Sequence, residues 1–92
     1  MFLHVEEVIH LENYKLRLKF NNGITKDVDL EQELIGEVFL PLRDLDRFRQ
    51  VYVNPETKTI EWPNGADFAP EFLFEIGDLV ETADLPAELE AA

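Results

Sequence analysis

The strongest constraint on the fold is a run of strict alternation between residues 14 and 20. Four apolar side chains alternate there with three basic ones: Tyr14, Leu16, Leu18 and Phe20 against Lys15, Arg17 and Lys19. A period of two places the two sets on opposite faces of a β-strand, so one face is buried and the other is charged. Asn21-Asn22-Gly23 follows, and a second alternating run extends from Ile24 to Leu30. Together the two runs predict an antiparallel β-hairpin.

The register of this hairpin follows from its side chains. A two-residue loop at Asn22-Gly23 would set Leu18 against Asp27, an apolar residue against a charged one. A three-residue loop over residues 21–23 instead matches both faces, giving the pairs Phe20–Ile24, Leu16–Val28, Tyr14–Leu30, Arg17–Asp27 and Lys15–Asp29. Because a slip of one residue moves every side chain to the other face, we predict the three-residue loop. It requires Gly23 in the left-handed conformation, next to a bulge.

The remaining elements are shorter. We predict a strand over residues 2–11 that is partly covered on both faces. A helical turn over 30–36, a buried apolar connector or short edge strand over 37–42 and a helix over 43–50 would follow the hairpin. The chain would continue with strands over 51–53 and 59–62 and with a helix over 70–76 that begins at Pro70 and stops at Gly77. The result is an α+β fold on an antiparallel sheet of about five strands, in the order β-β-β-α-β-β-α. Residues 1–76 would form a single domain, and residues 77–92 an acidic tail or a short docking helix.

Composition limits the chemistry. The chain has 92 residues, of which 46% are hydrophobic, enough for one core. It contains no cysteine and no serine, so disulfides, thiolate ligands and the usual covalent nucleophiles are missing. Four glycines form no phosphate-binding loop. The two histidines, His4 and His10, would lie about 20 Å apart on one strand, too far to share a metal ion. We therefore expect no enzyme, no metal and no cofactor.

The charge is strongly negative and unevenly distributed. The formal net charge is −12, all eight basic residues lie at or before position 58, and residues 59–92 hold nine acids and no base. This distribution disfavours nucleic acid and favours a basic protein partner. The bases of the 14–20 strand are matched by carboxylates of the next strand and predict no nucleic-acid patch. No apolar run approaches the length of about 20 residues that crosses a membrane, and the first residues lack a signal-peptide pattern, so we expect a cytoplasmic protein.

The stretch from Ile60 to Phe68 holds the candidate site. Its residues of interest are Trp62, Pro63, Asn64, Gly65 and Asp67, an interaction or structural motif at a turn between a strand and a helix. Trp62, the only tryptophan, is either a core residue or an exposed anchor for a partner. Asp67 either caps the turn or the helix start, or acts as a functional carboxylate; a general base would need a second group, for which Glu61 and Glu71 are the nominees.

Several motifs recur together in a known family. They are Tyr14-x-Leu16-x-Leu18-x-Phe20-Asn21-Asn22-Gly23, Val28-Asp29-Leu30, Gly36-x-Val38-Phe39-x-Pro41-Leu42, Phe48, Val51-x-Val53 and Ile60-x-Trp62-Pro63-Asn64-Gly65-Ala66-Asp67. Over about residues 3–75 the chain resembles the small bacterial proteins called domain of unknown function 2442. The resemblance implies an α+β fold on an antiparallel sheet. Some relatives carry a DNA-binding helix-turn-helix domain, and others look like partners of a second small protein, as in toxin–antitoxin pairs. This chain departs from the first kind, because nothing after residue 76 is long or basic enough for a helix-turn-helix.

Three functions remain in view. The leading hypothesis is a non-enzymatic protein–protein interaction module, either an antitoxin-like partner of a small basic protein or a homodimer. The first alternative is a small-ligand or enzymatic site around Trp62, Asn64 and Asp67. The second is a transcription-related, nucleic-acid-associated protein that binds through Lys15, Arg17, Lys19 and Lys26.

Overall fold

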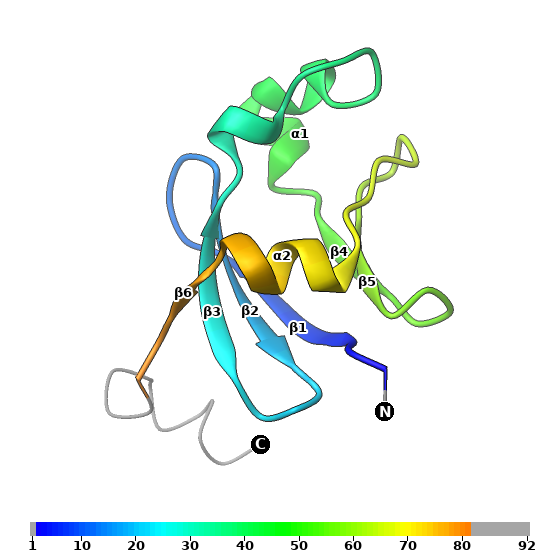
Figure 1. Cartoon of the computed structure of the whole chain (residues 1–92). Helices are drawn as coiled ribbons and strands as arrows, with labels where there is room; N and C mark the ends of the chain where they lie inside the picture. Colours follow the sequence, from blue (N-terminus) through cyan, green and yellow to red (C-terminus); the bar gives the residue numbers. More distant parts are fainter. Residues whose placement is uncertain (1, 82–92) are drawn as a thin grey trace.

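The structure is a computed structural model that describes residues 2–81. It contains two antiparallel sheets with short helices packed against them (Figure 1). The larger sheet has the strand order β1-β2-β3-β6, formed by Val5–His10, Lys15–Phe20, Thr25–Asp29 and Asp78–Leu79, and the smaller is the hairpin of β4 (Tyr52–Asn54) and β5 (Thr59–Glu61). The helices are the 3-10 turns η1 (Glu31–Glu33) and η2 (Leu40–Arg43) and the α-helices α1 (Leu45–Phe48) and α2 (Pro70–Ile76). The predicted α+β class is confirmed. Of the predicted tail, residues 82–92 lie outside the described residues.

The β2–β3 hairpin has the predicted register. Leu16 lies opposite Val28, and the backbone N–H of Phe20 donates to the carbonyl of Ile24 at 2.9 Å. The loop therefore comprises residues 21–23. Gly23 has a φ of 85° and donates its N–H to the carbonyl of Phe20 at 3.0 Å. The left-handed conformation predicted for this glycine is confirmed.

The charged face of the same hairpin is neutralised within the sheet. Arg17 lies opposite Asp27, and its Nε and Nη2 atoms donate to the two carboxylate oxygens at 2.8 and 2.9 Å. Lys15 lies opposite Asp29, as predicted. A two-pronged guanidinium–carboxylate pair is among the stronger polar contacts, and this one is partly shielded from water.

A bulge in β1 explains the mixed pattern of the first strand. Val5 lies opposite Phe20, but Glu7 lies opposite Lys19, so one extra residue stands between them in β1. The extra residue reverses the alternation, and Val5 and Val8 both pack against the core. The same reversal of the alternation in the sequence is the reason why this strand was predicted to be partly covered on both faces.

The strands β4 and β5 form a sheet of their own. They do not extend the first sheet, as a single sheet of about five strands would require. The tip of the hairpin reaches β1, where the N–H of Val5 donates to the carbonyl of Lys58 at 2.9 Å. One face of this hairpin packs inward: Ile60 and Trp62 are buried, and Val51 and Val53 pack against the core.

Residues 37–42 form neither a buried connector nor an edge strand, so this prediction was wrong. The chain turns after Gly36, whose carbonyl accepts the N–H groups of Phe39 and Leu40 at 3.2 and 2.9 Å, and it continues as η2. Val38 is 48% exposed and Leu40 is 52% exposed. The apolar run is therefore a turn that exposes Val38 and Leu40 and buries Leu42 in the core.

The helix predicted over residues 43–50 is shorter and divided. Asp44 has an extended backbone conformation and caps α1, because its side chain accepts the N–H of Asp46 at 3.0 Å. Two ion pairs lie on the surface of this segment: Asp46–Arg49 at 3.1 Å and Asp44–Arg47 at 4.0 Å. Both pairs are exposed and add little to stability.

The helix α2 begins at Pro70, as predicted, and lies across the larger sheet (Figure 1). The ring of Phe74 packs edge-on against Phe20, with centroids 5.1 Å apart. The ammonium of Lys26 lies 3.8 Å from the centroid of the same Phe74 ring. These contacts bury one side of α2 against the sheet and leave the other side to solvent.

The chain leaves α2 through Gly77 and enters β6, a strand that the sequence did not predict. Its two residues pair with β3, and the N–H of Val80 then donates to the carbonyl of Thr25 at 3.0 Å. A two-residue strand is too short to show an alternating pattern in the sequence, and β6 is defined only by its pairing with β3.

The core lies between the two sheets and the helices. Its largest fully buried side chains are Trp62, Phe20 and Phe48. Within residues 2–81, no helix is both long and apolar enough to cross a membrane.

Candidate functional site

Trp62 is a core residue. Its side chain is fully buried, and its indole Nε1 donates to the carbonyl of Phe48 at 2.9 Å. The ring also lies against that of Phe48, with centroids 5.6 Å apart. The tryptophan thus joins the end of β5 to α1, and it is not the exposed anchor that was one of its two predicted roles.

The turn after Trp62 is closed by its own polar groups. Gly65, with a φ of 89°, donates its backbone N–H to the carbonyl of Trp62 at 2.9 Å. The backbone N–H of Trp62 donates to the carbonyl of Ala66, also at 2.9 Å. The Asn64 side chain accepts the N–H of Ala66 at 3.1 Å and donates to the carbonyl of Val38 at 2.9 Å. Asn64 therefore shapes the turn and also fastens it to the exposed segment before η2.

Asp67 is exposed and does not cap α2. The N-cap position belongs to Ala69, and no side chain bonds the helix start there. Asp67 forms an isolated antiparallel bridge with Glu61 through the backbone. The turn-capping role considered for Asp67 is filled by Asn64.

An aromatic stack extends from the core to the surface beside this turn. The ring of Phe68 lies edge-on to Trp62, with centroids 6.0 Å apart, and is stacked on Phe39 at 4.7 Å and on Phe72 at 5.7 Å. These three phenylalanines are partly buried. The contact between Phe39 and Phe68 joins segments that are distant in the chain, so no local sequence pattern predicts it.

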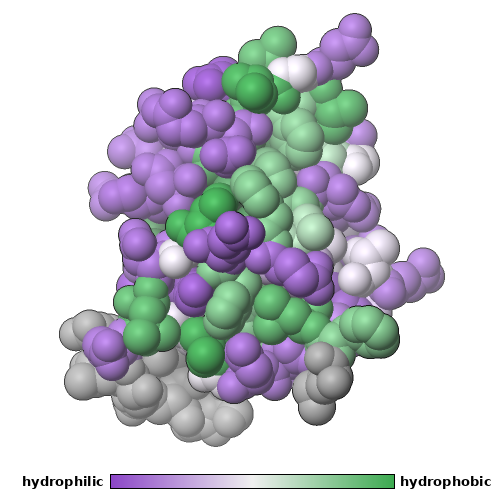
Figure 2. Space-filling model, in the orientation of Figure 1, coloured by the Kyte–Doolittle hydropathy of each residue, from purple (hydrophilic) through white to green (hydrophobic). Residues whose placement is uncertain are grey.

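Exposed aliphatic side chains continue this stack toward the upper end of the molecule. Ile35, Val38 and Leu40 are 66%, 48% and 52% exposed. We call these three residues, together with the stacked Phe39, Phe68 and Phe72, the apolar face. Figure 2 shows hydrophobic surface extending from the upper end of the molecule to the level of α2, with hydrophilic surface on both sides. Such a continuous exposed apolar surface is typical of a site that binds another macromolecule.

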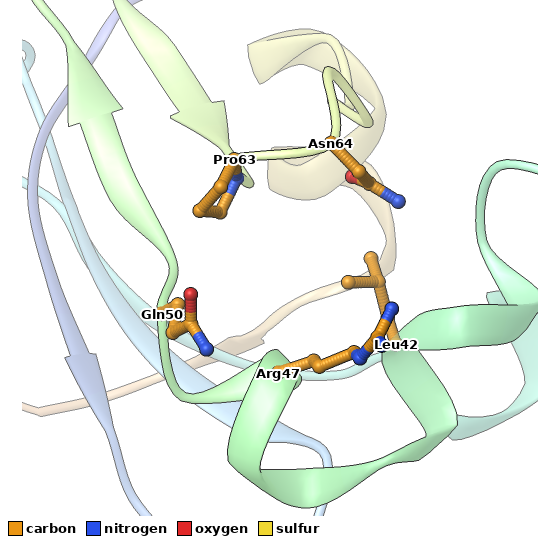
Figure 3. A pocket seen from close by; sticks show the side chains of 5 residues that line it. All are labelled: Leu42, Arg47, Gln50, Pro63 and Asn64. Carbon is orange, nitrogen blue, oxygen red and sulfur yellow. The ribbon is translucent and has the colours of Figure 1, made fainter.

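A pocket of about 300 Å³ lies beside the turn, lined by Leu42, Arg47, Gln50, Pro63 and Asn64. Figure 3 shows the side chains of the α1 region on one wall and those of the turn on the other. Neither Trp62 nor Asp67 lines this pocket. Of the three residues of the predicted ligand or enzymatic site, this pocket therefore includes only Asn64.

A second polar group lies on the hairpin of β4 and β5. The hydroxyl of Tyr52 donates to Glu61 at 2.6 Å, and Asn54 donates to the same carboxylate at 3.2 Å. The hydrogen bond to Glu61, with smaller contributions from burial and from the charge of that carboxylate, raises the pKa of Tyr52 above its ordinary value of 10.0. The Glu61 carboxylate is therefore held by Tyr52 and Asn54 of the neighbouring strand.

Two of the four bases considered for nucleic-acid binding are held by contacts within the fold. Arg17 is paired with Asp27, and Lys26 donates to the carbonyl of Phe74 at the end of α2. In the described part of the chain, no group of three or more His, Cys, Asp or Glu side chains could hold a metal ion.

A comparison with protein-family models matched residues 5–77 to the family described as protein of unknown function (DUF2442). The chain belongs to the DUF2442 family. The matched range of this DUF2442 protein begins with β1 and ends at Gly77, directly before β6, so it includes the turn, the aromatic stack and the exposed segment before η2. Searches of the curated proteins and of the solved structures found no significant match.

Proposed function

We propose that this DUF2442 domain is a non-enzymatic protein–protein interaction module, and that the apolar face is its binding surface. The observation that carries the proposal is the exposure of Ile35, Val38 and Leu40 next to the stack of Phe39, Phe68 and Phe72. Leaving aliphatic and aromatic side chains in water costs free energy that a partner recovers by covering them. The proposal places this interaction in the cytoplasm.

The composition supports a binding role over catalysis. The chain lacks serine and cysteine, and the residues once considered for a site are occupied in holding the fold: Trp62 bonds Phe48, and Asn64 bonds Val38 and Ala66. The partner in this proposal is either a second small protein, in an arrangement like a toxin–antitoxin pair, or a second copy of the chain.

The pocket lined by Arg47 and Gln50 supports a second candidate, a small-ligand site. Its polar groups are Arg47, Gln50 and Asn64, and its apolar walls are Leu42 and Pro63. A pocket of this size is at the lower end of the range for ligand sites, and it is open to solvent. We therefore rank it below the apolar face.

The proposed function is tested with a surface variant and a matched control in the native host. Val38→Ser together with Phe72→Ser removes apolar groups from the face, whereas Tyr52→Ser changes an exposed aromatic on β4 that lies outside the face. We expect one protein, or a second copy of the chain, to co-purify at near-equal amounts with wild type and with Tyr52→Ser, and to be lost with the double variant. If all three chains recover the same proteins, and light scattering shows only monomers, the apolar face is not a binding surface.

A further inference from the structure

The rim of the apolar face is acidic. Four exposed carboxylate residues lie in the same segments of the chain as its apolar residues: Glu37, Asp67, Glu71 and Glu75. The first two immediately precede Val38 and Phe68, and the other two lie four residues apart, so they follow one side of α2. In the described part of the chain, ion pairs join Arg17, Arg47 and Arg49 to Asp27, Asp44 and Asp46. The rim is thus negative and is not matched by those bases.

We propose that the apolar face binds a basic amphipathic segment of a different protein, an inference that rests on the function proposed above. The apolar side of such a segment would cover the aromatic stack, and its lysine and arginine side chains would lie against the acidic rim. Matching charges around an apolar centre speed association and reject partners of the wrong charge.

A second copy of the chain fits this surface less well. In a two-fold symmetric dimer the same patch meets itself, so each acidic rim would face the other. Placing like charges against each other across an interface costs about several kcal/mol of binding free energy. The chain also carries a net charge of −12, which adds to the repulsion between two copies. The charge pattern therefore selects a basic partner over self-association.

The face is held in place before any partner arrives. Phe68 packs on the buried Trp62, and its backbone carbonyl accepts the hydroxyl of Thr59. The segment that carries Val38 is fastened to the turn by Asn64. A surface that is already ordered loses less conformational entropy on binding, so more of the free energy gained by burying apolar area contributes to affinity.

Other charged macromolecules are disfavoured by the same rim. Nucleic acid and anionic membranes are negative, and their binding depends on basic residues that neutralise phosphate groups. Four exposed carboxylates lie along the apolar face, and Arg43, the base beside Ile35, already donates to the carbonyls of Leu34 and Glu31. Binding of a DNA duplex or of anionic vesicles would therefore count against the proposal.

The test uses the full chain and a labelled synthetic peptide as the probe. The peptide has about 16 residues, with leucine at helical spacing on one face and lysine and arginine on both flanks. One control peptide has the same composition in scrambled order, and the other replaces each basic residue with glutamate. By fluorescence anisotropy we expect the amphipathic basic peptide to bind at least about tenfold more tightly than either control. We also expect its affinity to fall as salt rises from about 50 to about 300 mM.

Two pairs of charge reversals locate the binding. Glu71→Lys with Glu75→Lys reverses the rim on α2, and Glu12→Lys with Glu56→Lys makes the same change in net charge at exposed sites away from the face. We expect the first pair to weaken binding by about tenfold or more and the second by about threefold or less, with both variants folded by circular dichroism.

The outcomes separate the two proposals. If the scrambled peptide binds equally well, or the two charge-reversal pairs weaken binding equally, the attraction is only net charge and the proposed basic segment is wrong. If the native partner depends on Val38 and Phe72 but not on Glu71 and Glu75, the interaction module stands and its basic partner does not. If light scattering shows a dimer that Phe72→Ser dissociates, the occupant is a second copy.

Discussion

Two glycines in this domain meet different physical requirements. Gly65 has a φ of 89° with open space around its missing side chain, so it is needed for its backbone conformation. Gly77 has an ordinary φ of −76°, but an added Cβ would lie 3.0 Å from the Leu73 carbonyl oxygen, from the Cβ of Lys26 and from the Cγ2 of Val28. It is therefore needed for close packing of the end of α2 on β3. The sequence marks both positions as helix or strand ends. Only the structure shows that Gly65 is needed for its backbone conformation and Gly77 for close packing.

Gly77→Ala tests the packing explanation. The added methyl group has to displace backbone as well as side-chain atoms, so we expect it to lower the free energy of unfolding by about 1–3 kcal/mol in urea titrations. The same substitution made in a Val28→Ala background should cost less, because one of the three close atoms is gone. Equal costs in the two backgrounds would contradict the steric explanation.

At the scale of the elements, prediction succeeded where two independent signals agreed. Both faces of the β2–β3 hairpin required one register, and Pro70 and Gly77 enclosed α2, so these elements were placed correctly. It failed where the decisive contact lay elsewhere in the chain. The change of alternation in β1 depends on a bulge opposite β2, and β6 depends on its pairing with β3. The run over residues 37–42 was predicted to be buried because apolar residues usually are, but Val38 and Leu40 are exposed.

The candidate site was foreseen only in part for the same reason. Trp62, Asn64 and Gly65 were identified as a turn motif, and the structure shows that Trp62 bonds α1 and Asn64 bonds Val38. The stacking of Phe39 on Phe68 joins two segments that no local pattern relates. The apolar face therefore became visible only when the chain was folded.

The link between the turn and the exposed segment can be measured with two substitutions at one position. Asn64→Asp keeps an oxygen that can accept the N–H of Ala66 but loses the donor to Val38, whereas Asn64→Ala loses both bonds. We expect Asn64→Ala to lower the free energy of unfolding by about 1–3 kcal/mol and Asn64→Asp by less. Both should speed amide hydrogen exchange at residues 37–40 relative to β2. Unchanged exchange in that segment would show that the bond to Val38 does not order it.

At the scale of the whole molecule, charge is separated along the chain. The bases all precede residue 59, and several are used inside the fold, with Arg17 on Asp27, Lys26 on α2 and Arg43 on the carbonyls of Leu34 and Glu31. This excess of negative charge is one of the grounds for the basic protein partner proposed above.

Self-repulsion among these carboxylates makes the fold sensitive to salt. At neutral pH the net charge is −12, and screening it weakens repulsion that opposes the compact state, so we expect the melting temperature to rise as sodium chloride increases from about 20 to about 300 mM. The Arg17–Asp27 pair works in the opposite direction, but it is one partly shielded pair against an excess of twelve charges. Near pH 4.3, where the sequence has no net charge, the same addition of salt should raise the melting temperature much less or lower it. A rise of the same size at both pH values, measured by calorimetry, would mean that salt acts through ion exclusion and apolar burial instead of through screening.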